Sequence, residues 1–94
     1  MIQLQERTVT EGATGITETW RPVGYFYAKV IPLDVRTVAD YQKLNTVVSH
    51  KILIKGEVNV KIGKHRFVGD KVYVVSTSAK YYRGYTEVMV REWV

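Results

Sequence analysis

The feature that most constrains the fold is the stretch at residues 49–76, where β-branched residues alternate with lysines and glycines interrupt the run. Alternation of period two places successive side chains on opposite faces of a strand. Short strands that are apolar on one face and basic on the other, separated by glycine turns, favour an antiparallel sheet. The sequence therefore predicts a mainly β protein with a basic outer surface.

The same pattern extends through most of the 94 residues. We expect strands at residues 2–9, 16–31, 47–55, 58–62, 66–68, 71–76 and 86–93, a turn or loop at residues 11–15, and a tyrosine-rich connection before the last strand. Pro22 and Gly24 predict a bend or bulge in the second strand. Six or seven short strands predict a single domain over residues 1–94, built as a small antiparallel β-barrel or sandwich.

One segment departs from the β pattern. Residues 34–45 follow a helical stripe only loosely, and their first residue, Asp34, is a potential N-cap. We expect a long loop with one or two helical turns between the second and third main strands. Long excursions in compact domains are usually functional or disordered, so this loop is a candidate functional segment.

Composition excludes several classes of protein. The chain has no cysteine, which removes disulfides, thiolate metal sites and thiol catalysis. No segment approaches the roughly 18 to 20 apolar residues of a membrane helix, and the opening residues lack the basic and apolar regions of a secretory signal. We therefore expect a soluble protein that stays in the cell that makes it and has no membrane partner.

The net charge of +5 is unevenly distributed. Residues 50–71 hold six cations against two anions, whereas the rest of the chain is close to neutral. Such a concentration of charge favours contact with polyanions or acidic proteins. The alternative is a solvated strand face whose lysines discourage edge pairing. The candidate basic surface comprises Lys51, Lys55, Lys61, Lys64 and Arg66.

The two histidines, His50 and His65, offer weak catalytic candidates. A metal site would need Asp70 or Glu57 as a further ligand, and the spacing is not that of a ligand set. The same histidines could act as general acid and base, with Lys51 binding phosphate, in a metal-free ribonuclease. This hypothesis requires all three residues to lie close together in the tertiary structure.

Nucleophilic catalysis has less support. Ser49 precedes His50, but neighbours on a strand point to opposite faces, so we expect no hydrogen bond between them. The sequence IGKH lacks the spacing and the following helix of a phosphate-binding loop. We therefore expect no enzyme, no catalytic residue, no metal and no cofactor.

Aromatic residues suggest a different class of function. Tyr81, Tyr82 and Tyr85 surround Arg83, and exposed rings beside cations stack on the bases of single-stranded nucleic acid. The alternative is that the rings fill the core or contact other proteins. A small basic β-barrel that binds single-stranded nucleic acid is thus one functional hypothesis.

Taken in order, the segments of the chain resemble the phage head-tail joining family, the head-closure or stopper proteins of long-tailed bacteriophages. The resemblance spans nearly the whole chain. The matching segments are IQLQER, the Gly15 turn before Trp20, YFYAKVIPL, SHKILIK, NVKIGKHRFVGDKVYVVSTS and YTEVMVREW.

This resemblance implies a β-barrel subunit that forms a ring with copies of itself, commonly twelve. The ring would lie in the virion neck, between the portal-bound adaptor protein and the tail terminator or tail completion protein, after assembly in the cytoplasm of the infected bacterium. It would retain packaged double-stranded DNA and provide the surface on which the tail docks.

The resemblance also implies roles for particular residues. The loop at residues 33–45 would point into the channel and gate it, through Asp34, Arg36, Thr37, Asp40, Tyr41, Gln42 and Lys43. Its mixed charges suit pairing between neighbouring subunits better than tight binding of DNA. Candidate contacts with subunits or partners are Trp20, Tyr25, Tyr27, Arg91 and Trp93.

Overall fold

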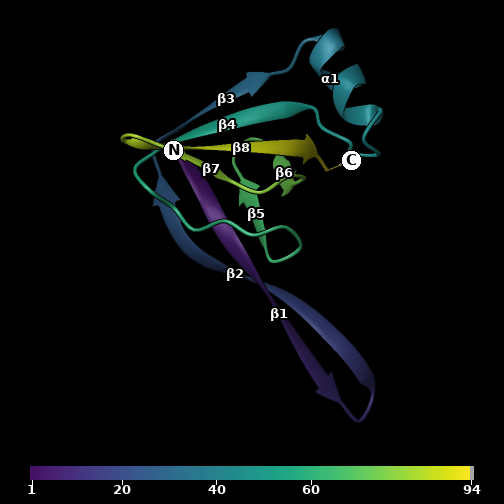
Figure 1. Ribbon diagram of the computed structural model, residues 1–94. Helices are drawn as coiled ribbons and strands as arrows, with labels where there is room; N and C mark the ends of the chain where they lie inside the picture. Colours follow the sequence, from purple (N-terminus) through teal and green to yellow (C-terminus); the bar gives the residue numbers. More distant parts are fainter. Residues whose placement is uncertain (94) are drawn as a thin grey trace.

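The computed structural model describes residues 1–93 and shows one antiparallel sheet with one short helix (Figure 1). The mainly β prediction is confirmed. The strands are β1 (Ile2–Gly12), β2 (Gly15–Phe26), β3 (Ala28–Pro32), β4 (His50–Lys55), β5 (His65–Val68), β6 (Val72–Val75), β7 (Lys80–Tyr82) and β8 (Tyr85–Glu92), and the helix is α1 (Val35–Gln42).

The sheet has the strand order β2-β1-β5-β6-β8-β4-β3, with β7 paired to β8. Its two end strands, β2 and β3, are consecutive in the chain and separated only by Tyr27. The carbonyl of Tyr27 accepts a hydrogen bond from the Lys55 N–H at 3.0 Å. The sheet therefore curls until its ends meet through the chain itself. The hydrogen-bonded path is open, and closure into a complete barrel stays a prediction.

The core lies on the inner face of this curled sheet. Buried residues alternate with more exposed ones along β4, β5, β6 and β8, as the period-two pattern predicts. Helix α1 contains no buried residue, so strands rather than a helix cover the apolar face. The most deeply buried apolar residues are Leu4, Ile52, Ile54, Phe67, Val88 and Val90.

The strand predicted at residues 58–62 is wrong. Val58 and Val60 are buried, but residues 57–61 form an irregular segment outside the ladder. The buried hydroxyl of Thr86 accepts a hydrogen bond from the Val58 N–H at 3.0 Å and donates one to the Gly56 carbonyl at 2.8 Å. The Thr86 side chain thus binds the backbone that a neighbouring strand would otherwise bind. The alternation of apolar and polar residues in this segment shows which side chains are buried, not that the segment is a strand.

The tyrosine-rich connection also differs from prediction. Residues 80–82 form β7, which pairs with β8 through a turn at Gly84, where φ is 90°. A positive φ of this kind favours glycine. Together with the division of the long second strand at Tyr27, this hairpin raises the number of strands to eight.

The bulge predicted at Pro22 and Gly24 is present. The register between β1 and β2 shifts where Leu4 pairs with Gly24 and Gln5 pairs with Pro22, so Val23 is the extra residue. Beyond the bulge, the hairpin leaves the body of the protein (Figure 1).

We call residues 7–19 the arm. Every residue of the arm is exposed, because β5 pairs with β1 only at residues 3–6. The strands continue to Gly12 and resume at Gly15, so the loop expected at residues 11–15 is a tight turn.

The role of Thr86 can be tested by Thr86→Val, which keeps the side-chain volume and removes the hydroxyl. The Val58 N–H and the Gly56 carbonyl would lose their partner, and a buried unpaired polar group costs about 1–3 kcal/mol. We expect urea denaturation to show a loss of this size. The matched control, Thr17→Val on the exposed arm, should change stability by less than about 0.5 kcal/mol. Equal effects of the two variants would contradict the role assigned to Thr86.

Candidate interaction surfaces

The arm has two chemically different faces. Residues directly opposite each other in an antiparallel pair lie on the same face, and successive residues alternate between faces. Val9 pairs with Glu18 and Glu11 pairs with Ile16, which defines an acidic–apolar face. The other face, which we call the threonine face, is made by the pairs Thr8–Thr19 and Thr10–Thr17.

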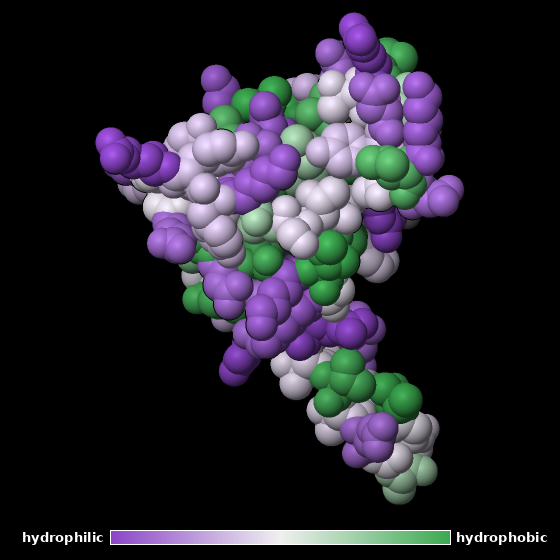
Figure 2. All heavy atoms as spheres, in the orientation of Figure 1, coloured by the Kyte–Doolittle hydropathy of each residue, from purple (hydrophilic) through white to green (hydrophobic). Residues whose placement is uncertain are grey.

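The acidic–apolar face is open to solvent. Ile16 is 71% exposed and Val9 is 50% exposed. Figure 2 shows apolar side chains on the arm, separated from the body by a hydrophilic region. Glu18 lies 4.0 Å from Arg7, whereas no described residue forms an ion pair with Glu11. The outer part of the arm, residues 8–19, contains two acids and no Lys or Arg.

A charged cluster fixes the base of the arm. The Glu6 carboxylate contacts Lys64 at 3.3 Å and Arg21 at 3.5 Å. The hydrogen bond from Lys64, with the nearby positive charges, lowers the pKa of Glu6 against the opposing effect of desolvation. Three segments of the chain are thereby tied together where β1 leaves the sheet.

Arg66 makes a second link at the arm base. Its guanidinium lies 4.4 Å from the centre of the Trp20 ring, and its Nε donates to Gln5 Oε1 at 2.7 Å. A cation over an aromatic face is attracted by the ring quadrupole. Trp20 is half-buried and has Arg66 over its ring, and its predicted contact with partners stays a prediction.

His65 lies beneath the same region and is buried. Its Nδ1 accepts a hydrogen bond from the Lys61 N–H at 2.9 Å, which requires a ring nitrogen without a proton. Burial lowers the pKa of His65, although the negative charge of Glu6 acts in the opposite direction. The neutral imidazole therefore helps to hold the irregular segment before β5.

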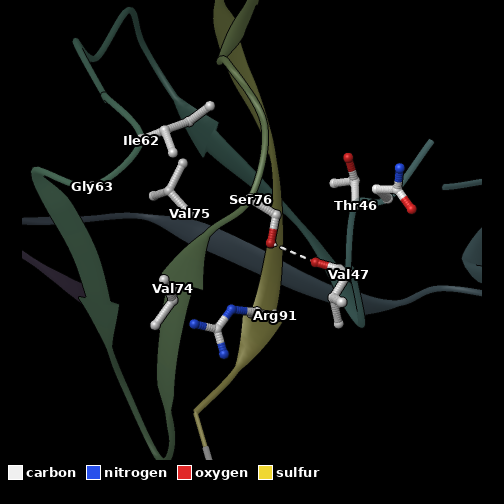
Figure 3. Close-up of a pocket in the computed structure, with 9 residues that line it drawn as sticks. Thr46, Val47, Ile62, Gly63, Val74, Val75, Ser76 and Arg91 are labelled. Atoms are coloured by element: carbon white, nitrogen blue, oxygen red, sulfur yellow. Dashed lines mark hydrogen bonds between the residues drawn. The ribbon is translucent and has the colours of Figure 1, made fainter. Parts of the chain in front are cut away.

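A shallow hollow of about 370 Å³ lies where Ile62 and Gly63 follow that segment. We call it the Arg91 groove. Val47, Ile62 and Val74 supply apolar walls, and Arg91 supplies a cation (Figure 3). The Ser76 hydroxyl donates to the Val47 carbonyl at 2.7 Å and fixes one wall. Val47 is 61% exposed and Ile62 is 56% exposed, so the groove presents apolar surface to solvent.

The predicted excursion carries α1, as expected. Asp34 is the N-cap: its Oδ1 accepts a hydrogen bond from the Thr37 N–H at 2.8 Å, which lowers the pKa of Asp34. Asp40 lies 3.9 Å from Lys43 in the same chain. The remaining residues of the predicted gating set, Arg36, Tyr41 and Gln42, also lie on α1.

The cations of the predicted basic surface lie on separate parts of the sheet. Lys51 and Lys55 are on β4, whereas Arg66 is on β5 and Lys61 and Lys64 precede it. Strands β6 and β8 lie between β4 and β5. Lys64 and Arg66 are engaged at the arm base, as described above.

None of the predicted contact aromatics belongs to the core. Tyr25 and Tyr27 are exposed, and the Tyr25 hydroxyl accepts a hydrogen bond from Gln3 Nε2 at 2.9 Å. Trp93 is exposed beside the end of β8. Of this set, Arg91 is the residue that lies in a groove.

The tyrosine hairpin of β7 and β8 is open to solvent. Tyr81, Tyr82 and Tyr85 are all exposed. The rings of Tyr82 and Tyr85 stack on each other with their centres 5.1 Å apart. Part of the aromatic surface expected to meet nucleic acid is thus used within the hairpin.

The expectation about Ser49 and His50 is wrong. Their Oγ and Nδ1 atoms lie 2.8 Å apart. Strand β4 begins at His50, so Ser49 is outside the ladder and free of strict alternation. The Ser49 hydroxyl also accepts the Glu92 N–H at 2.8 Å, and the His50 ring meets the edge of Tyr73. These contacts connect the start of β4 to β8 and β6.

His50 and His65 therefore have separate sets of partners. Within residues 1–93, no three metal-ligating side chains of the His, Cys, Asp or Glu types form a group. The same part of the chain has no helix with the length and apolar character needed to cross a membrane.

The arm and the Arg91 groove were not predicted as sites. A signal for the arm is present in the sequence, because threonine occupies every second position at residues 8–10 and 17–19. The groove has no such signal, because residues 47, 62, 74 and 91 come from four distant segments.

Comparison with known proteins shows the fold. No protein-family model matches the chain, and no curated protein matches it. The solution structure of protein SF1141 from Shigella flexneri 2a superposes with a TM-score of 0.70 at 18% identity, covering 98% of this chain and 91% of that one. The described sheet is therefore an arrangement that a natural protein of similar length also adopts.

The buried His65 predicts a dependence of stability on pH. An unfolded histidine titrates near pH 6.5, whereas the folded pKa is lower, so below pH 6.5 the unfolded chain binds more protons. The free energy of unfolding should then fall as the pH drops from 6.5 toward the folded pKa, by at most about 1.4 kcal/mol per pH unit. Urea denaturation between pH 7.5 and pH 5 measures this fall.

The control is His65→Asn, whose side-chain oxygen can accept the Lys61 N–H without titrating. We expect this variant to lose less stability on acidification than the natural chain. Identical pH profiles for the two proteins would contradict the assignment to His65.

Proposed function

We propose that this chain is a structural, non-enzymatic subunit of a bacteriophage neck. It forms a ring between the portal-bound adaptor and the tail, retains the packaged DNA and provides the surface to which the tail attaches. The observation that carries the proposal is the arm, in which every residue from 7 to 19 is exposed. Exposed strand that contributes nothing to its own core is typical of a protein that completes its contacts in an assembly.

The ends of the sheet support the same proposal. Each of β2 and β3 is paired on one side, so each offers unpaired backbone groups. Edges of this kind promote uncontrolled pairing unless they are covered. A ring in which each subunit contacts the next by the same head-to-tail interface covers such surfaces systematically.

The charges on the excursion are compatible with a channel that DNA must leave. The Thr37 N–H binds Asp34 and Lys43 lies beside Asp40, so both acids of the excursion have partners within the chain. Arg36 and Lys43 balance these two acids, and the segment has no net charge. A neutral excursion can narrow a channel without binding the phosphate backbone tightly, because phosphate contacts dominate affinity for DNA.

An alternative function is binding of single-stranded nucleic acid by the tyrosine hairpin. The exposed rings of Tyr81, Tyr82 and Tyr85, with Lys80 and Arg83 beside them, are the observation in its favour. Two features weigh against it: the stacking of Tyr82 on Tyr85, and the separation of the other cations onto β4 and β5.

The neck proposal is tested by inactivating this reading frame in its phage. We expect electron micrographs to show heads that lose their DNA and tails that remain detached. Supplying the chain from a plasmid should restore infectious particles. Normal yields of complete particles without the chain would overturn the proposal.

Measuring the affinity of the purified chain for oligonucleotides at two salt concentrations distinguishes the alternative from the neck proposal. The neck proposal expects negligible affinity of the purified chain for single strands. The alternative expects measurable affinity that falls steeply between 50 and 200 mM salt. It also expects Tyr81→Ala to cost about 1–3 kcal/mol of binding, the contribution typical of one stacked base.

A further inference from the structure

The outer arm and the Arg91 groove carry opposite charges, and both expose apolar side chains. The arm is a narrow two-stranded projection, and the molecule measures 47 Å along its longest axis but only 23 Å along its shortest. The groove is a hollow in the body, formed where the residue 45–47 and 62–63 segments meet β6 and β8 (Figure 3). Each surface is exposed, and each combines apolar side chains with an unpaired charge.

We propose that the acidic–apolar face of one copy binds the Arg91 groove of a second copy. This inference rests on the proposed function and identifies the contact by which neighbouring subunits meet. Val9 and Ile16 of one chain cover Val47 and Ile62 of the next. The Glu11 carboxylate pairs with the Arg91 guanidinium.

Charge complementarity favours a second copy as the occupant. Residues 8–19 carry two acids and no Lys or Arg, whereas Arg91 is the only charged residue that lines the groove, and the exposed Lys61 precedes Ile62 in the chain. No described residue forms an ion pair with Glu11 or Arg91. Both are exposed within one chain, and complementary charges of this kind steer association and fix its register.

The two faces of the arm explain why the contact has a direction. The threonine face has no charge and no large apolar side chain, so only the opposite face matches the groove. The arm and the groove are different surfaces of one molecule, so the contact is head-to-tail. Such a contact generates a closed ring when its rotation closes.

The absence of cysteine makes the contact directly testable in the full chain. One preparation carries Ala13→Cys at the arm tip, and a second, tagged preparation carries Thr46→Cys in the groove. Each chain then has a single thiol, so every disulfide is intermolecular. The two are mixed over a concentration range up to 1 mM, oxidised mildly and resolved by mass on a non-reducing gel.

We expect the tip–groove disulfide to exceed, by at least fivefold, the product formed between Ala13→Cys and Arg83→Cys, a thiol placed on the exposed turn of the tyrosine hairpin. Adding Glu11→Arg to the tip chain should reduce the yield to the control level. Adding Arg91→Glu to the groove chain as well should restore much of it. Thr10→Arg, the matched change on the threonine face, should leave the yield within twofold of the starting value.

A tip–groove yield equal to that of the Arg83→Cys control at every concentration would overturn the inference. Equal losses from Thr10→Arg and Glu11→Arg would also overturn it, because the contact would not depend on the face. Neither result bears on the neck role itself, which is tested by the particles that form without the chain. Conversely, a specific tip–groove disulfide together with normal particles would retain the contact and reject the neck proposal.

Discussion

The whole structure depends on the need of a single sheet to cover its own apolar face. Helix α1 buries no residue, so within residues 1–93 the strands themselves, with Val58 and Val60 of the irregular segment, shield the core from water. The sheet therefore curls, and its two end strands, β2 and β3, are joined through Tyr27. A small domain has a small hydrophobic core, and most of the core residues of this chain lie on one face of the curled sheet. The outer face and both edges are left to solvent or to partners.

The arm follows from this arrangement. Strand β1 belongs to the curled sheet only as far as Glu6, where its pairing with β5 ends, and beyond that point it has β2 alone. An isolated two-stranded hairpin is marginally stable in water. The Glu6 cluster and the contact of Arg66 with Trp20 link the base of the arm to the residues around the start of β5. The result is an oriented projection whose two faces differ, which suits it for a directional contact between copies.

Residues 51–55 and 58–62 show that alternation of apolar and polar residues does not by itself identify a strand. Both segments alternate apolar and polar residues, yet only the first is a strand, because β8 supplies its ladder while the Thr86 hydroxyl binds the backbone at Val58. The hydrogen bond between Ser49 and His50 arises for a related reason, since the strand predicted from residue 47 begins three residues later, at His50. Alternation reports which side chains are buried, whereas the partner of the backbone is decided by distant residues.

The sequence by itself determined the β class, the N-cap at Asp34, the bulge around Pro22 and Gly24, and the alternation that separates the arm's two faces. Each of these depends on neighbours a few residues apart, where steric limits and strand period act locally. Only the tertiary structure decided that β4 and β5 lie apart, which divides the predicted basic surface, and that Ile62 lines one groove with Arg91. Strand order brings together residues far apart in the chain, and no local pattern encodes that choice.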